Sequence, residues 1–217
     1  MFASEFEGLL ALRAAGVRAP EPYRHGVAFI EMERLDLGGP ADWAAMGRMV
    51  AGLHRNTGER YGWEADNWIG RSPQPNGWSD DWADFFWRKR LTPQLQRAGI
   101  SVDEKKTRQI LEGHRPQASL LHGDLWSGNA GFTPQGPVIF DPAVYYGDRE
   151  ADLAMTELFG GFPAQFYTSY RKDFPLDAGY ERRKHLYNLY HLLNHLNLFG
   201  GGYRAQVERT LRFLGLE

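Results

Sequence analysis

Apolar residues recur at intervals of three and four along much of the chain, which is the spacing that places them on one face of an α-helix. Residues 41–58 are the clearest case. Trp43, Met46 and Val50 share one face there, and Gly58 is the expected end of the helix. The same spacing predicts further helices over residues 4–16, 81–99, 103–114, 148–159, 162–172, 179–199 and 203–214, with a break at the glycines 200–202.

The first of these helices carries its own predicted boundaries. Ser4 and Glu7 have the spacing of a capping box, in which each side chain bonds the main chain of the other. Gly16 is expected to end the helix, because glycine readily adopts the left-handed conformation found after a last turn.

Strand patterns are few and short. Residues 23–35 predict two strands joined near Gly26, and residues 118–124 predict an apolar strand that runs into a turn. Residues 130–140 predict a hairpin whose tip is the sequence TPQG. Helices therefore dominate, and the chain belongs to the α+β class.

One long stretch, residues 61–80, has neither a helical nor a strand period. It is rich in Trp, Gly, Pro, Asn and Asp, so we expect a loop. A loop of this length in a compact chain is usually functional or disordered, and its tryptophans argue against disorder.

Composition narrows the function classes. The chain has 217 residues, of which 42% are hydrophobic and 24% are charged, a mix typical of globular proteins. The formal net charge is -2 and no basic run occurs, so neither nucleic-acid binding nor membrane-surface binding is expected. The chain lacks cysteine, a signal-peptide pattern and any apolar run near the ~20 residues of a membrane span. We therefore expect a cytoplasmic protein.

Three polar residues in the middle of the chain have the spacing of a phosphotransferase site. Asp124 follows the predicted strand, Asn129 lies five residues later, and Asp141 follows the hairpin. Protein-kinase-like enzymes use such a set, in which an acid orients the attacking hydroxyl and oxygen ligands hold Mg²⁺ on the phosphates. The alternative is that Asp124 and Asn129 are ordinary turn residues. The flanking strand, the hairpin and the second aspartate favour the catalytic interpretation.

The sequence around these residues resembles the fructosamine kinase family. The resemblance rests on LLHGDLWSGN, PVIFDPAVYYGDRE, DNWIGRSPQPNGW and LYNLYHLLNHLNLFGGGYR, and it extends over nearly all of the chain. It implies a protein-kinase-like fold with a mostly helical C-terminal lobe. It also implies Mg²⁺- and ATP-dependent phosphorylation of a ketoamine sugar, carried by a small sugar-amine or by a glycated protein.

The resemblance also implies roles for individual residues. Asp124 would be the base or hydroxyl-orienting acid, and Asn129 and Asp141 would be the Mg²⁺ ligands. Trp126 would stack on the sugar or pack in the core. His122 would contact the substrate or brace the catalytic loop. A further acid would hydrogen-bond the main chain of the catalytic loop or complement a helix N-terminus, and Asp152 is its candidate.

The start of the chain corresponds to only part of the family's ATP-binding lobe. Residues 1–35 would be a remnant of that lobe and its hinge, and residues 36–217 the C-terminal lobe. Glu5 falls at the ion-pair position of the lobe's helix, although it is also an ordinary first-turn acid. No lysine precedes Lys89, and no G-x-G-x-x-G motif occurs. The hinge residues that would contact adenine through their main chain are Met32, Glu33 and Arg34.

This interpretation leaves two other functions open. A shortened lobe would favour a non-catalytic, pseudokinase-like binding module, and its exposed strand edge would favour a homodimer. A metal-dependent phosphohydrolase that uses Asp124 and Asp141 is a further alternative. His191 and His195 have a metal-binding spacing, but the leucines around them favour a packed helix.

Overall fold

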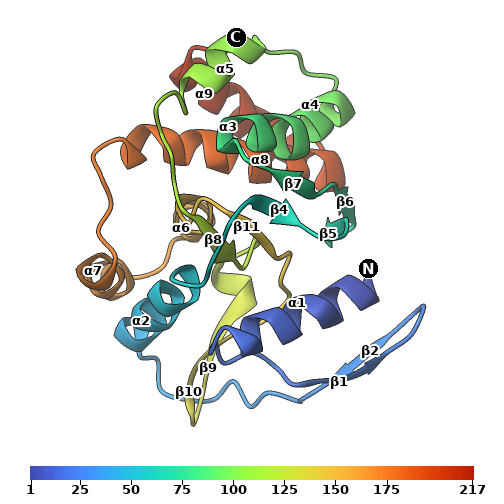
Figure 1. Ribbon diagram of the computed structural model, residues 1–217, viewed down its shortest axis with the longest axis vertical. Coiled ribbons are helices and arrows are strands. Elements are labelled where there is room, and N and C mark those ends of the chain that lie inside the picture. Colours follow the sequence, from blue (N-terminus) through green and yellow to red (C-terminus); the bar gives the residue numbers. More distant parts are fainter.

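The computed structural model describes residues 1–217, and its N-terminal part is one helix packed on a two-stranded hairpin (Figure 1). Helix α1 spans Phe2–Ala14, and strands β1 (Pro22–His25) and β2 (Ile30–Met32) pair antiparallel. The helix begins earlier than expected, and the hydroxyl of Ser4 donates to the carbonyl of Met1 at 2.7 Å. The predicted capping box is therefore wrong, because Ser4 already lies inside the first turn.

A five-stranded antiparallel sheet crosses the centre of the molecule. Its strand order is β3-β8-β11-β4-β7. The predicted strand is β8, and its four residues are all buried. The helix expected to end at Gly58 stops at His54, and Gly58 instead belongs to β3. The strands are β3 (Thr57–Gly58), β4 (Tyr61–Trp63), β7 (Gly77–Ser79), β8 (Ala118–Leu121) and β11 (Tyr145–Gly147).

The stretch expected to be an irregular loop, residues 61–80, contains four strands. Strands β4 and β7 pair with each other in the central sheet, and between them β5 (Asn67–Ile69) and β6 (Ser72–Gln74) form a hairpin. The prediction failed because each strand has only three residues, too few to establish an alternating pattern.

The predicted hairpin after the catalytic sequence is present. Strands β9 (Ala130–Thr133) and β10 (Gly136–Ile139) pair antiparallel, with Ala130 opposite Ile139. The main-chain N–H of Phe140 donates to the carbonyl of Asn129 at 3.0 Å. This pairing brings Asn129 and Phe140, the residues before and after the hairpin, together although they are eleven positions apart in the sequence.

Helices make up the rest of the fold. Helices α2 and α7 lie side by side at the lower left of Figure 1, while α8 runs between α6 and α9. Helix α8 ends at Phe199, so the predicted break at residues 200–202 is confirmed. The helices are α2 (Trp43–His54), α3 (Trp82–Phe85), α4 (Thr92–Ala98), α5 (Glu104–Gln109), α6 (Glu150–Leu158), α7 (Ala164–Asp173), α8 (Tyr180–Phe199) and α9 (Arg204–Leu214), with a π-helical segment at Phe86–Leu91 and short 3-10 turns at Ser127–Asn129 and Gly201–Tyr203.

Two buried clusters lie on either side of the central sheet. One is centred on α8 and α3, and the other joins α1, α2, α7 and the β9–β10 hairpin. Leu9 and Leu12 of α1 belong to the same cluster as Met46 and Val50 of α2. The first 35 residues therefore share a core with the helical part, and their division into two lobes stays a prediction. None of the helices is both long and apolar enough to cross a membrane.

Candidate active site

The chain turns sharply between β8 and Asp124, and a glycine makes this turn possible. Gly123 has a φ of 83°, in the left-handed region. A Cβ atom added at Gly123 would lie 2.1 Å from the carbonyl oxygen of Ala143. Only glycine therefore fits this position, because any side chain would meet both unfavourable φ and main-chain contact. The turn directs Asp124 away from the buried strand.

Asp152, on α6, stabilises this turn through hydrogen bonds. Its carboxylate accepts the main-chain N–H groups of His122 at 2.7 Å and Gly123 at 2.9 Å. The same carboxylate hydrogen-bonds Nε2 of His54 at 3.1 Å. Burial raises the pKa of Asp152, but the hydrogen bonds and the nearby imidazoles outweigh it and lower that pKa overall. The hydrogen bonds expected from Asp152 to the loop main chain are thus present.

His122 has both ring nitrogens committed within the protein. Its Nε2 hydrogen-bonds the carbonyl of Phe140 at 3.0 Å, and the main-chain N–H of Asp124 donates to its Nδ1 at 3.3 Å. The side chain is completely buried, and burial lowers its pKa. These contacts favour the bracing interpretation of His122 over its assignment to the substrate set, since no ring nitrogen remains for a sugar.

Asn129 and Asp141 converge on Asp124. The amide nitrogen of Asn129 donates to the carbonyl of Asp124 at 2.9 Å and to its carboxylate at 3.2 Å. This leaves the amide oxygen of Asn129 as a free acceptor. Asp141 is exposed, its carboxylate makes no hydrogen bond or ion pair, and its φ is 57°. Aspartate tolerates this left-handed conformation better than most residues do.

Asp124 and Asp141 line a pocket of about 220 Å³ between α1, the β5–β6 hairpin and the turn at Gly123. Asn129 does not line it and is buried behind Asp124, to which it is hydrogen-bonded. Asp124, Asp141 and Glu5 supply three carboxylates to it, and Arg71 is the only cationic side chain that lines it. Burial and then the charge of Asp141 raise the pKa of Glu5. The structure thus brings Glu5 to the predicted site.

Burial and acidic neighbours also change the pKa of Asp124. Burial first and the charge of Asp141 second raise the pKa of Asp124 to about 7, while its hydrogen bond with Asn129 opposes the shift. Positive charge brought to Asp141 would lower this pKa again, since it would cancel the repulsion between the two carboxylates.

The predicted hinge residues do not line this pocket. The carboxylate of Glu33 binds the guanidinium of Arg18 at 2.5 and 2.7 Å, and these bonds lower the pKa of Glu33 to about 2. The main-chain N–H of Glu33 donates to the carbonyl of Glu21 at 2.8 Å. Met32 is partly buried, and Arg34 is exposed. An adenine contact at these three residues stays a prediction.

Trp126 begins a line of aromatic side chains beside the catalytic loop. Its ring meets Phe159 edge to face at 6.2 Å, and Phe159 lies 4.5 Å from His195 and 6.2 Å from Tyr203. Trp126 is only half-buried, so it is not a core tryptophan. The sequence did not indicate Phe159 and Tyr203, because the loop and helix that carry them lie far along the chain from Trp126.

A buried polar network, also missed from sequence, supports the segment after Asp141. Gln74 donates to the carbonyl of Ala143 at 3.1 Å, and Asn67 donates to that of Val144 at 2.8 Å. Gln74 also accepts a hydrogen bond from Tyr190 at 2.7 Å. The only sequence signal was the amide-rich stretch 67–76, and its partners could not be read from it.

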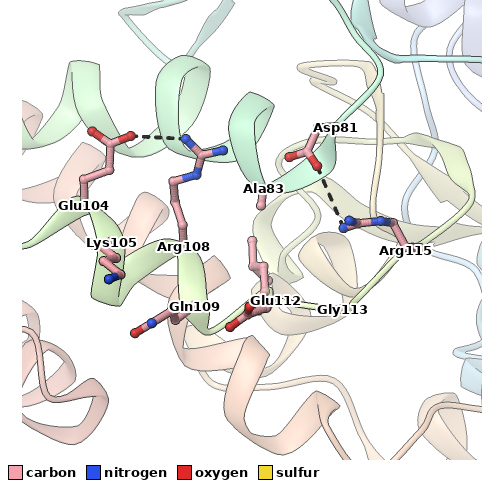
Figure 2. Close-up of a pocket in the computed structure, with 10 residues that line it drawn as sticks. Asp81, Ala83, Glu104, Lys105, Arg108, Gln109, Glu112, Gly113 and Arg115 are labelled. Carbon is pink, nitrogen blue, oxygen red and sulfur yellow. Dashed lines mark hydrogen bonds and ion pairs between the residues drawn. The ribbon is translucent and has the colours of Figure 1, made fainter.

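Two other groups of polar residues lie outside this site. A larger pocket, of about 640 Å³, lies between α3 and α5, where Arg108 pairs with Glu104 and Arg115 with Asp81 (Figure 2). It contains none of the predicted site residues, and its charges neutralise one another.

The other group, His114, Asp148 and Glu150, has its ligand atoms within 4.8 Å of one another. Arg183 binds both carboxylate oxygens of Glu150 at 2.7 Å, and Tyr187 donates to Asp148 at 2.5 Å. These bonds already satisfy the carboxylates, so the group is an ion-pair network rather than a free metal site. Nδ1 of His195 hydrogen-bonds the carbonyl of His191, and His191 is buried in the core cluster around α8.

Comparison with known proteins gives the same assignment as the geometry. A family model described as fructosamine kinase matches residues 1–215. The chain is 49% identical to a probable ketoamine kinase of Synechocystis sp., over 98% of this chain and 78% of that protein. It is 42% identical to a chloroplastic protein-ribulosamine 3-kinase of Arabidopsis thaliana, over 95% of this chain and 70% of that protein.

The comparison with solved structures agrees with the sequence comparison. The crystal structure of a fructosamine-3-kinase homologue from Haemophilus somnus superimposes with a TM-score of 0.92 at 32% identity, covering 99% of this chain and 79% of that one. An ADP-bound aminoglycoside phosphotransferase superimposes with a TM-score of 0.59 at 14% identity, covering 98% and 80% of the two chains. The latter likeness shows the kinase-like fold alone.

Proposed function

Because this chain belongs to the fructosamine kinase family, we propose that it transfers the γ-phosphoryl group of ATP to a hydroxyl of a ketoamine, such as a ribulosamine or fructosamine. The observation that carries the proposal is that Asp124 and Asp141 line one pocket, and that Asn129 is hydrogen-bonded to the carboxylate of Asp124. Two of the relatives described above are named as ketoamine or ribulosamine kinases, which supports the substrate class. Nothing observed favours a non-catalytic binding module.

The donor set at the pocket fits Mg²⁺. The ion prefers carboxylate and amide oxygens together with water. The amide nitrogen of Asn129 is hydrogen-bonded to Asp124, which leaves its oxygen as an acceptor, and the carboxylate of Asp141 has no partner. We assign both residues as ligands. When bound, the cation would neutralise negative charge on the transferred phosphoryl group.

Asp124 has the position and environment of the group that orients the acceptor hydroxyl. Its carboxylate keeps one hydrogen bond from Asn129 and faces the pocket that contains Asp141. In phosphoryl transfer such an acid accepts the hydroxyl proton while the attacking oxygen is held in line. Arg71, which also lines the pocket, is the cationic side chain that would contact the phosphates. Glu5, on α1, also lines the pocket.

The aromatic line beside the catalytic loop is the proposed acceptor site. Trp126 and Phe159 present ring faces and edges next to Asp124, and apolar ring surfaces commonly stack on the faces of sugars. The acceptor would be a small sugar-amine or a glycated protein. A cytoplasmic location and adenine contacts at Met32, Glu33 and Arg34 are parts of the same proposal.

A homodimer through the β1–β2 hairpin is a separate part of the proposal. The two strands pair only with each other, so each has an unpaired edge. Tyr23, Val27 and Phe29 are exposed on the same hairpin. Unpaired edges and exposed apolar side chains both favour association with a second chain.

An ADP-release assay tests the proposed reaction. The purified chain, with Mg²⁺ and ATP, is expected to release ADP only when a synthetic ribulosamine is added, and phosphate should appear on the sugar by ³¹P NMR. Replacing Asp124 with Asn should abolish this release. Phosphate release from ATP or simple esters without any acceptor would instead indicate a phosphohydrolase, and ADP release that survives in Asp124→Asn would remove the assigned role of Asp124.

A further inference from the structure

A second pocket, separate from the catalytic one, combines aromatic rings with free carboxylates. It has a volume of about 620 Å³, and its walls come from α1, β4, β7 and β11. No residue that lines it also lines the catalytic pocket. Its six lining residues are Glu7, Trp63, Glu64, Ala65, Trp78 and Tyr146.

The register of the central sheet gathers the rings. Trp78 of β7 and Tyr146 of β11 both pair with Gly62 of the strand between them, β4. The centres of the two rings lie 6.3 Å apart. A Cβ atom at Gly62 would lie 1.8 Å from the carbonyl oxygen of Gly77, so only glycine fits between the two strands. Trp63 stacks on Tyr146 at 5.7 Å and 29°.

Each ring has one face turned away from the core. Trp63 and Tyr146 pack against both buried clusters on one side and are only partly buried, while Trp78 is 44% exposed. Exposed aromatic faces are electron-rich and attract cations, most strongly for tryptophan. The pocket therefore offers partly exposed aromatic surface from two indoles and one phenol to a ligand.

The charged side chains around the rings are acidic, so their sign also favours a cation. Glu7 and Glu64 are exposed and make no ion pair or side-chain hydrogen bond. No lysine or arginine lines the pocket. Two unpaired carboxylates beside three aromatic faces form a site for an organic cation, because charge attraction and cation–π attraction act together there.

We propose that this pocket binds the ammonium group of a lysine side chain on the protein that carries the ketoamine. The proposal rests on the proposed function, since it makes the pocket a second contact for a glycated protein. The pocket cannot hold the reacting sugar, because Asp124 does not line it. It nevertheless adjoins the catalytic pocket through one element, since α1 supplies Glu5 to one and Glu7 to the other.

Binding is tested first without any reaction. A short peptide with one lysine, and its sibling with norleucine at that position, are titrated against the full chain without nucleotide, and the peptide signals are followed by NMR. Ring-current shifts of the lysine side-chain protons are expected for the lysine peptide alone. They should vanish in Trp78→Leu and weaken about fivefold in Glu7→Gln/Glu64→Gln. Equal shifts for both peptides, or shifts that persist in both variants, would overturn the proposal.

Kinetics test the consequence for the substrate. Glu7→Gln/Glu64→Gln should raise KM about fivefold for a glycated peptide that carries a second lysine, and leave KM for a small ribulosamine unchanged. Glu59→Gln/Glu112→Gln, which replaces two exposed acids outside the pocket, is the charge-matched control and should change neither KM. An equal rise in KM for both substrates would overturn the proposal. Absence of turnover with every ketoamine would contradict the proposed function, while the NMR titration would still decide the pocket.

Discussion

The carboxylate of Asp152 accepts a hydrogen bond from the main-chain N–H of Gly123 at 2.9 Å, although 29 positions of sequence separate them. Helix α6 thereby holds the turn that presents Asp124. A second bond, to the N–H of His122, uses the other oxygen, so the two N–H groups that follow β8 are both satisfied. The position of Asp124 thus depends on a residue outside the catalytic loop.

Replacing Asp152 with Ala should lower the free energy of unfolding by ~3–5 kcal/mol, because it leaves Nε2 of His54 and two buried N–H groups without a partner. Urea unfolding measures this change. Asp152→Asn, which keeps the shape, should lower kcat more than it raises KM. The control is Asp103→Ala, which removes an exposed helix cap and should cost only ~1 kcal/mol. Equal losses for Asp152→Ala and the control would contradict the bracing role.

Replacing Gly123 with Ala should prevent the catalytic turn. The new Cβ would meet the carbonyl of Ala143, and the positive φ adds strain, for a combined cost of at least ~3 kcal/mol. Gly136 is a matched control, because it also has a positive φ but nothing lies within 4 Å of its added Cβ. Gly136→Ala should cost only ~1–2 kcal/mol. Thermal unfolding of the two variants, followed by circular dichroism, separates the clash from the strain.

Asp124→Asn should reduce kcat by about 10²–10⁴-fold while leaving the fold intact, because it removes the acceptor for the hydroxyl proton. Its unfolding free energy should be unchanged or higher, since burial already disfavours the charged form. Asp80→Asn, at an exposed acid outside the pocket, is the control and should retain full kcat. A stable Asp124→Asn variant with normal kcat would refute the assignment.

Arg71→Ala should raise KM for ATP about tenfold, which corresponds to ~1.4 kcal/mol of charge-assisted hydrogen bonding. The reason is that Arg71 is the only cationic side chain that lines the catalytic pocket. KM for the ketoamine should change little. Arg48, exposed on α2 without an ion pair, provides the control variant Arg48→Ala. A rise in the ketoamine KM alone would instead place Arg71 at the acceptor.

His191 should make the protein less stable in mild acid. Burial lowers its pKa to about 3 from an ordinary value of 6.5, so the unfolded chain binds a proton that the folded chain refuses. The resulting stability is present above pH 6.5 and declines as the pH falls toward 3. Between pH 7.5 and 5.5 this residue should account for a loss of ~1.4 kcal/mol.

Urea unfolding at those two pH values measures the loss, and His191→Gln should remove it. The exposed His25 serves as the control, and His25→Gln should leave the pH dependence as it is. An identical pH dependence in wild type and His191→Gln would show that the buried imidazole is not the cause.

The sequence by itself determined the family, the predominance of helices and the three residues Asp124, Asn129 and Asp141. These features are local in the sequence. A helix shows its hydrophobic period over several turns, and the three proposed site residues lie next to one strand, one turn and one hairpin. The pairing of β9 with β10 fixes where Asp141 returns, so its position beside Asn129 followed from the chain alone.

Only the tertiary structure decided what surrounds these residues. The strands of residues 61–79 are three residues long and acquire their pairing from β11 and from each other, which no local pattern encodes. Arg71, Phe159 and the pocket formed by Trp63, Trp78 and Tyr146 depend on contacts between segments far apart in sequence. Their roles appear only when the chain is folded, because packing rather than propensity brings their side chains together.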